Sequence, residues 1–245
     1  MSVTHNKTIE DGVKSLLKAN GESVGVKWEY REKKPDDMTD SLIIDGKAYP
    51  IFYWRYDPQV QAIARNAKFN IGGSVSAKTT GLIKREYGID AYLYKELDAA
   101  EWILDSDIKK ITATLNKNAA AVILTMENGK VATLELGAAL PEGAEEQTRH
   151  TAWGREGMES TRVVSTKVRP QSVYVFTDSK TPYTYNDTTL ELYGLTLEQS
   201  TIAVSIYKML TEVTDYAALT ERDERLRRYI DIVKKSDITG ESVEL

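Results

Sequence analysis

The sequence contains no cysteine, which excludes disulfide bonds, thiol catalysis and sulfur-ligated metal sites. A chain without cysteine fits the reducing cytoplasm, so we expect a cytoplasmic protein. Histidine is also scarce, since only His5 and His150 occur. Two histidines are too few for a histidine-rich metal site, and we expect no metal. A serine–histidine–aspartate triad would have to use His150.

Long apolar runs and clusters of positive charge are missing as well. No stretch approaches the ~18 consecutive apolar residues of a membrane span, and residues 1–12 lack the apolar core of a signal peptide. The net charge is −5, and lysine and arginine are dispersed along the chain. We therefore expect neither nucleic acid nor a membrane surface as a partner.

The motifs of nucleotide-binding folds are absent too. Neither G-x-G-x-x-G nor G-x-x-x-x-G-K-[ST] occurs. The pair Gly72-Gly73 follows a predicted helix and precedes a predicted strand, whereas a dinucleotide site needs the order strand, glycine turn, helix. The sequence thus predicts that this chain has no NAD(P) site of its own.

A hairpin over residues 119–137 is the clearest structural signal. Asn128-Gly129 favours a two-residue type I′ turn, in which both central residues have positive φ. Such a turn pairs Met126 with Val131 and Ile123 with Leu134. It places Ala121 and Ile123 on one face with Leu134 and Leu136, and Val122, Leu124, Met126 and Val131 on the other.

Both faces of this hairpin are largely apolar, although an antiparallel sheet with one wet face alternates apolar and polar residues. We therefore expect helices on one face of the sheet. A second copy of the chain would cover the other face, in a homodimer or a higher homo-oligomer. A hairpin inside an ordinary sandwich would give the same pattern.

Apolar periodicity and turn signals predict the remaining elements. Asp45-Gly46 predicts a second hairpin, Thr220 is the predicted cap of the last helix, and residues 178–189 are rich in turn signals. Helices are predicted at 8–19, 58–71, 90–104, from 197 and from 221; strands at 24–30, 41–44, 48–54, 74–78, 109–115, 147–153, 160–166, 172–177 and 242–245. The order of helices, strands and helices predicts an α+β fold with one large, mostly antiparallel open sheet that carries helices on one face.

Several short motifs resemble, in order and spacing, the C-terminal domain of the Gfo/Idh/MocA oxidoreductases, the glucose–fructose oxidoreductase and inositol dehydrogenase family. They cover about three quarters of the chain, from about Arg55 to the end. The motifs are Arg55-Tyr56-x-Pro58 before a helix, Ile71-Gly72-Gly73-Ser74-Val75, the helix of residues 91–104, the hairpin MENGKVATLEL, Gly154–Gly157, and the ending with Ser236, Gly240, Val243 and Leu245.

The resemblance implies a domain at residues 51–245 that binds substrate and mediates assembly. Residues 1–50 would be a remnant or replacement of the family's N-terminal Rossmann domain. NAD(P) would then bind only where a partner, such as a separate Rossmann-domain chain, supplies that domain. The family's E-K-P segment has a poor counterpart at Glu32-Lys33-Lys34-Pro35, where we expect a solvated loop.

The family's helix reads D-x-x-x-H-x-x-D, with the histidine as acid or base. Aligned on Asp98, this chain has Ala91 in place of the first aspartate and Lys95 in place of the histidine. Lys95 and Asp98 are therefore the candidate catalytic residues, and a lysine can act as a base when its pKa is strongly lowered. Candidate substrate-binding residues are Arg55, His150 and Tyr183. Each of the three also has a structural interpretation, as an ion-pair partner, a strand hydrogen-bonding residue or a packed aromatic.

Three functional hypotheses follow. The first is an oxidoreductase-family protein reduced to a domain for substrate binding and oligomerisation, acting on or binding a sugar- or polyol-like ligand. The second is a non-catalytic binding or scaffold homologue. The third is a cofactor-independent enzyme that uses Lys95, Asp98 and His150. The sequence leaves catalysis itself open.

Overall fold

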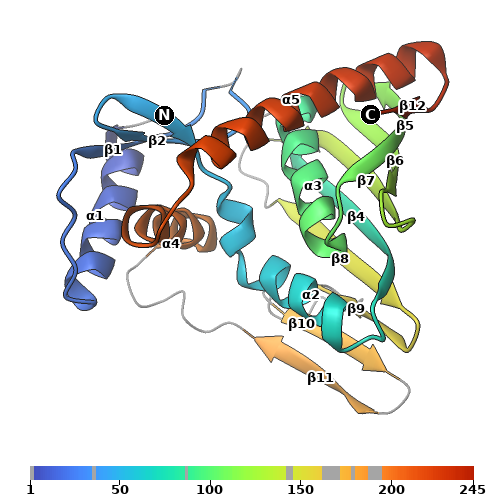
Figure 1. Ribbon diagram of the computed structural model, residues 1–245, viewed down its shortest axis with the longest axis horizontal. Coiled ribbons are helices and arrows are strands. Elements are labelled where there is room, and N and C mark those ends of the chain that lie inside the picture. The colour runs from blue at the N-terminus through green and yellow to red at the C-terminus, as the bar shows by residue number, and fades with distance from the viewer. Residues whose placement is uncertain are drawn as a thin grey trace. The chain divides into compact units, whose positions relative to one another are not determined.

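The computed structural model describes residues 3–34, 37–85, 88–141, 146–161, 172–177, 180–186 and 195–245 (Figure 1). The chain divides into two compact units, Met1–Asp57 with Thr188–Arg225, and Pro58–Asp187 with Leu226–Leu245. The division therefore differs from a single cut after residue 50, because a late segment of the chain joins the first unit.

The first unit combines a small antiparallel sheet, of order β1-β2-β3, with helices. Asp45 and Gly46 both have positive φ, 48° and 85°, and form the predicted two-residue turn between β2 and β3. Its elements are α1 (Val3–Ala19), β1 (Trp28–Arg31), β2 (Ser41–Ile44), β3 (Lys47–Pro50), the 3-10 helix η1 (Tyr53–Tyr56) and α4 (Leu197–Thr211).

Helix α4 belongs to this unit because it packs on α1 and η1. Ile9 and Val13 of α1 and Ile202 and Ile206 of α4 are buried. The predicted capping box at the start of α4 is present: Gln199 N donates to Thr196 Oγ1, and Thr196 N donates to Gln199 Oε1.

The second unit is built on a nine-stranded sheet of order β11-β10-β9-β8-β4-β7-β6-β5-β12. Every neighbouring pair is antiparallel except β4 with β7, so the α+β class and the mostly antiparallel sheet are confirmed. Its strands are β4 (Ser74–Lys84), β5 (Ile108–Asn116), β6 (Ala119–Met126), β7 (Val131–Leu140), β8 (Gln147–Gly154), β9 (Gly157–Ser160), β10 (Ser172–Thr177), β11 (Lys180–Asn186) and β12 (Val243–Glu244).

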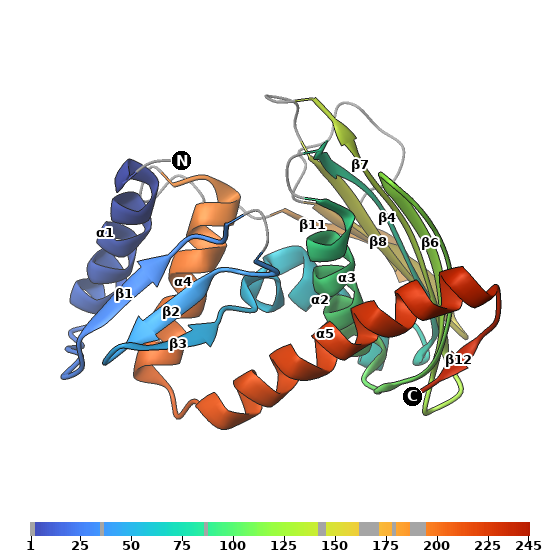
Figure 2. The ribbon, with the colours of Figure 1, turned by 90° about the horizontal axis from the view of Figure 1, so that it is seen from above.

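Helices cover one face of this sheet (Figure 2). Helix α2 (Pro58–Phe69) packs on β8, β9 and β10, and α3 (Gly88–Leu104) packs on β4, β7 and β6. Helix α5 (Tyr216–Thr239) reaches the sheet through Ser236, whose hydroxyl oxygen accepts from Ala113 N at 3.0 Å. No described element covers the opposite face, which we call the open face.

The predicted register of the central hairpin is wrong by one residue. Thr125 pairs with Val131 and Ile123 with Thr133. Met126 N donates to Lys130 O at 2.9 Å, Gly129 N donates to Met126 O at 3.0 Å, and Gly129 has a φ of 79°. This is a three-residue loop, a type I turn followed by a left-handed glycine that forms a bulge, rather than a type I′ turn.

The shift in register changes which side chains share a face. Val122 and Leu124 are buried under the helices together with Leu134 and Leu136, whereas Ala121 and Ile123 lie on the open face. Because side chains alternate along a strand, a one-residue error exchanges the two faces completely.

Three further predictions are also corrected. The last helix begins at Tyr216, because Asp215 Oδ1 accepts hydrogen bonds from Ala217 N and Ala218 N, both at 3.0 Å; Thr220 lies inside the helix. The turn-rich segment at 178–189 contains strand β11, which pairs with β10. The strand predicted at 160–166 is found earlier, because β9 spans Gly157–Ser160 and Thr161 lies beyond its end; residues 162–166 lie outside the described residues.

Candidate functional site: a buried polar cluster under helix α3

Polar side chains from α3 and β8 meet on the helix-covered face of the sheet. Glu96 and His150 are 0% and 5% exposed, respectively. Glu96 Oε2 lies 2.8 Å from His150 Nε2, and Glu96 Oε1 lies 3.9 Å from Lys95 Nζ. A fully buried carboxylate therefore bridges a buried imidazole and a partly exposed ammonium.

Tyr92 contacts the same strands one helical turn before Glu96. The Tyr92 hydroxyl lies 2.8 Å from Thr148 Oγ1, on β8. Gly81 of β4 lies beneath it, and a Cβ atom there would be 1.7 Å from the Tyr92 hydroxyl. Glycine at position 81 thus lets the tyrosine, and with it α3, approach the sheet closely.

The backbone of His150 is held by the end of β9. His150 N donates to Thr161 Oγ1 at 3.1 Å, and Thr161 N donates to His150 O at 3.0 Å. Ser160 Oγ donates to the same carbonyl at 3.3 Å. These bonds fix the position of the imidazole relative to α3.

The charge state of Glu96 depends on its partners. Burial by itself raises the pKa of this carboxyl, but the charge and hydrogen bond of His150, with smaller effects of Lys95 and Thr79, hold its pKa below the ordinary value. Glu96 is therefore an ionised acceptor, and the imidazole Nε2–H donates to it.

Glu159, on β9, is a second buried carboxyl on this face. It is 0% exposed and pairs with the buried Ala152, which lies two residues after His150. Both of its oxygens are buried, and neither has a hydrogen bond of good geometry. Burial raises its pKa to about 8, opposed by the nearby Asn66 amide, so this carboxyl is mostly protonated at neutral pH.

The structure brings two of the predicted site residues together. Lys95 and His150 meet through Glu96. Asp98 is buried and lies three residues after Lys95, where helical geometry makes the two side chains neighbours.

Arg55 and Tyr183 are not joined to the cluster by any described contact. Arg55 lies in η1 of the first unit, where its guanidinium stacks 5.2 Å from the Phe52 ring centre. The backbone of Tyr183 pairs with Val175 in β11, and its side chain lies outside the described residues. Lys33 lies in the segment that connects β1 with β2 along the chain, and its backbone N–H donates to Asp40 at 2.8 Å.

Sequence reasoning missed Glu96 and Glu159. A signal for Glu96 did exist, because it lies three residues after Leu93 and four before Ala100, both of which are in the apolar stripe predicted for this helix. A charged residue within such a stripe needs a buried partner. Glu159 carries no comparable signal in its short strand.

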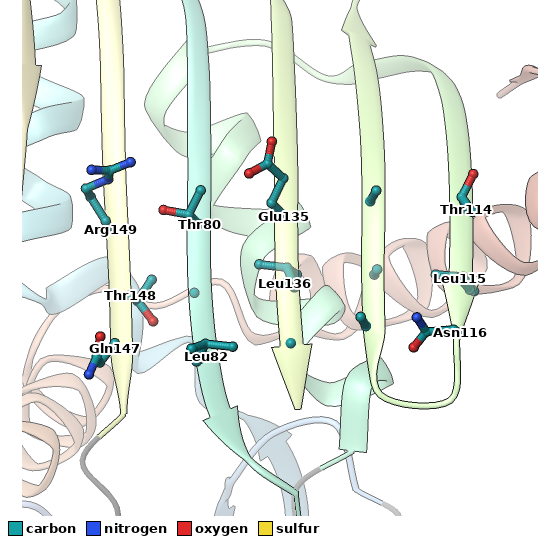
Figure 3. A pocket seen from close by; sticks show the side chains of 15 residues that line it. Thr80, Leu82, Thr114, Leu115, Asn116, Glu135, Leu136, Gln147, Thr148 and Arg149 are labelled. Atoms are coloured by element: carbon teal, nitrogen blue, oxygen red, sulfur yellow. The ribbon is translucent and has the colours of Figure 1, made fainter. Parts of the chain in front are cut away.

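A hollow of about 890 Å³ lies elsewhere, on the open face (Figure 3). Arg149, Thr80, Glu135 and Thr114 form one row across it, and Gln147, Leu82 and Asn116 form the next. Small residues such as Gly137 and Ala119 leave its floor low. This hollow and the polar cluster therefore lie on opposite faces of the sheet.

The described residues contain no group of three or more histidine or acidic side chains arranged to hold a metal ion. No described helix is long and apolar enough to cross a membrane.

Solved structures with the same fold are oxidoreductases of the Gfo/Idh/MocA type. The similarity to a levoglucosan dehydrogenase in complex with NADH and levoglucosan covers 79% of this chain and 65% of the dehydrogenase chain, with a TM-score of 0.62 and 14% identity. The similarity to a myo-inositol dehydrogenase from Corynebacterium glutamicum covers 79% of this chain and 63% of that dehydrogenase, with a TM-score of 0.57 and 19% identity.

The similarity to an oxidoreductase from Agrobacterium radiobacter in complex with NAD+, L-tartaric acid and magnesium covers 78% of this chain and 63% of that oxidoreductase, with a TM-score of 0.61 and 14% identity. This chain thus spans somewhat less than two thirds of the length of these structures. No protein-family model and no curated protein matches the sequence. At such low identity these similarities establish the fold.

Proposed function

We propose that this chain is the substrate-binding and assembly part of an oxidoreductase that acts on a sugar- or polyol-like ligand. The observation that carries this proposal is the Lys95–Glu96–His150 cluster, in which Glu96 and His150 are buried and Lys95 is partly exposed; it lies in a fold shared with levoglucosan and myo-inositol dehydrogenases. Buried donors and acceptors in a largely apolar setting are typical of sites that orient a polar ligand.

We propose further that the chain does not bind NAD(P) by itself. Its first unit has three antiparallel strands, whereas a dinucleotide fold needs parallel strands joined through helices. Hydride transfer to or from the ligand would then need a nicotinamide held by another polypeptide, such as a separate Rossmann-domain chain.

The open face is proposed as the contact with a second copy of the chain. Leu82, Ile123, Val131 and Trp153 lie on it with 36–51% of their surface exposed. Ile123, Val131 and Trp153 lie near one another at one end of this face, and Leu82 lies at the other end. Exposed apolar side chains gathered on one sheet face are typical of an association surface. Lys78 and Glu135 form an ion pair beside them, so their charges are matched within the chain.

A non-catalytic binding or scaffold role is the second candidate. It is favoured by Ala91 and Lys95, which replace the aspartate and histidine that the resemblance to the family's helix implies. On this alternative the ligand site and the dimer remain, and no reaction follows.

Calorimetric titration tests the proposal. We expect the purified chain to bind myo-inositol or levoglucosan with a measurable heat and to show no binding of NADH or NADPH up to millimolar concentration. Nicotinamide binding at micromolar concentration would contradict the cofactor part of the proposal. No heat with either polyol would contradict the ligand part.

A further inference from the structure

The hollow on the open face has a low, apolar floor. Gly137 pairs with Leu82 on one side and with Ala119 on the other. A Cβ atom on Gly137 would lie 2.7 Å from Leu82 Cδ2, so the leucine side chain leans over the glycine. In Figure 3, Leu82 and Asn116 point inward from the two sides of these small residues. The floor therefore offers apolar contact with about 890 Å³ of space above it.

One unbalanced positive charge lies in this hollow. Among the residues that line it, Arg149 and Glu135 are charged. Glu135 Oε1 lies 2.5 Å from Lys78 Nζ, so its charge is matched within the chain. Thr80 pairs with both Arg149 and Glu135 and thus separates them by one strand. The guanidinium of Arg149 forms no ion pair with another described residue, and the hollow presents it to a ligand.

A carboxylate suits this cation, because its two oxygens accept parallel hydrogen bonds from the planar guanidinium. From Arg149 on β8 to Ala119 on β6 the hollow crosses three strand spacings, about 14 Å. We propose that the hollow binds a monocarboxylate with an extended apolar body, of the kind of a medium-chain fatty acid. Its carboxylate lies on Arg149 and its chain crosses Leu82 and Ala119. The volume of the hollow is within the usual range of small-molecule sites.

This site is separate from the apolar end of the open face. Of the exposed apolar side chains on that face, Leu82 lines the hollow, whereas Ile123, Val131 and Trp153 lie outside it. The ligand therefore needs no second copy of the chain. The site also lies on the face of the sheet opposite the polyol site proposed above, so this inference goes beyond that function and does not rest on it.

The hollow shares two strands with the buried polar cluster. Thr80 pairs with Arg149, and the next pair along the two strands is Thr79 with His150. Because side chains alternate along a strand, the first pair points to the open face and the second to the helices. One peptide bond joins Arg149 to His150, so a ligand held by Arg149 should change the surroundings of the imidazole. His150 thus reports that the hollow is occupied.

Calorimetric titration of the full chain with decanoate, decylamine and acetate tests the inference. We expect decanoate to bind at one site per chain, at least about tenfold more tightly than decylamine, which Arg149 repels, or acetate, which has no apolar body. Arg149→Met is expected to weaken decanoate binding by roughly tenfold to a hundredfold, the effect of losing a hydrogen bond to a charged group. Arg155→Met, at an exposed position after β8, is the matched control.

A second variant tests the floor of the hollow while leaving its charge unchanged. Ala121 lines the hollow and is exposed, so Ala121→Leu should fold and fill part of the space. We expect it to weaken decanoate binding by at least about tenfold, because the leucine takes the place of the apolar chain. Ala48→Leu, at an exposed strand position of the first unit, is the control and should bind decanoate as the wild type does.

Nuclear magnetic resonance of the imidazole groups gives a measure on the unmodified chain, which has only His5 and His150. We expect decanoate to shift the His150 resonances and leave those of His5 unchanged. Equal binding of decanoate and decylamine, binding that Arg149→Met leaves unchanged, or no binding of decanoate overturns the inference. So does a change of sedimentation in Arg149→Met or Ala121→Leu without decanoate binding to the wild type, because a second copy would then occupy the hollow. Polyol binding is measured separately, and either result can fail without the other.

Discussion

Two buried carboxyl groups distinguish the helix-covered face of this sheet from an ordinary hydrophobic core. Glu96 and Glu159 lie on the same face of the sheet and are both fully buried, yet their environments shift the pKa of the two carboxyl groups in opposite directions. His150 keeps the pKa of Glu96 below its ordinary value, whereas the effect of burial on the pKa of Glu159 outweighs that of the nearby Asn66 amide. One face therefore carries an ionised and a neutral carboxyl at neutral pH.

Glu159 should make the protein less stable as the pH rises. Its pKa is about 8 in the folded chain and near 4.5 when exposed, so between these values the unfolded chain releases a proton that the folded chain keeps. The free energy of unfolding therefore falls with pH across this window. Glu159→Gln should remove up to about 5 kcal/mol of that fall.

Urea denaturation between pH 4.5 and pH 9 measures this effect. Glu156→Gln, at an exposed neighbouring position, serves as the control and should keep the slope of the wild type. A Glu159→Gln protein with an unchanged slope would show that Glu159 ionises normally.

Gly81→Ala should destabilise the second unit by about 1–3 kcal/mol, the usual cost of overpacking. The new methyl group would lie 1.7 Å from the Tyr92 hydroxyl. Tyr92→Phe removes that hydroxyl, so the double variant should lose less stability than the sum of the two single variants. Denaturation of all four proteins measures the coupling, and strict additivity would contradict the proposed contact.

At the scale of residues, the sequence predicted Lys95 and His150 as separate candidates and could not join them. They are 55 positions apart in the chain, and their connection runs through Glu96, whose place in the apolar stripe of the helix indicates a buried partner without identifying it. Only the phase of α3 and the pairing of β8 with β4 place the three together.

Among the elements, the central hairpin shows that the local sequence can predict two strands without determining the type of turn between them. Periodicity located both of its strands, but Asn128-Gly129 fits two kinds of turn. Contacts outside the hairpin favour the longer loop: Asn128 Nδ2 and Lys130 Nζ donate to Leu104 O, at the end of α3, at 3.3 and 2.9 Å. The hairpin tip thus caps a helix, and that contact cannot be predicted from the hairpin alone.

Gly129→Ala should cost about 1–2 kcal/mol of stability, because its φ of 79° places a side chain in the left-handed region. Glu127→Ala, in the same exposed loop, should change stability by less than about 0.5 kcal/mol. Thermal and urea denaturation compare the two. Equal effects would contradict the loop geometry.

For the molecule as a whole, the sequence predicted most elements of the second unit. It did not predict which elements belong to each of the two units. Alternating apolar residues identified most of the strands, including the closing strand near Val243. The return of α4 to the first unit depends on its packing against α1 and η1, far away in sequence. Such long-range packing leaves no local pattern in the chain.

The proposed dimer predicts that Ile123→Lys yields a folded monomer. Ile123 is 51% exposed, so the substitution should leave the fold intact while introducing a charge into an apolar contact. Sedimentation velocity measures the change. Val213→Lys replaces an apolar residue fully exposed in the first unit and should keep the dimer. A wild-type chain that sediments as a monomer at micromolar concentration would contradict the proposal.

The most direct test of polyol binding under α3 is a crystal structure of the chain with myo-inositol. We expect an inositol hydroxyl within about 2.6–3.2 Å of Lys95 Nζ, the partly exposed group of the cluster, with His150 still bonded to Glu96. Inositol bound only on the open face, or no bound inositol at a saturating concentration, would contradict it.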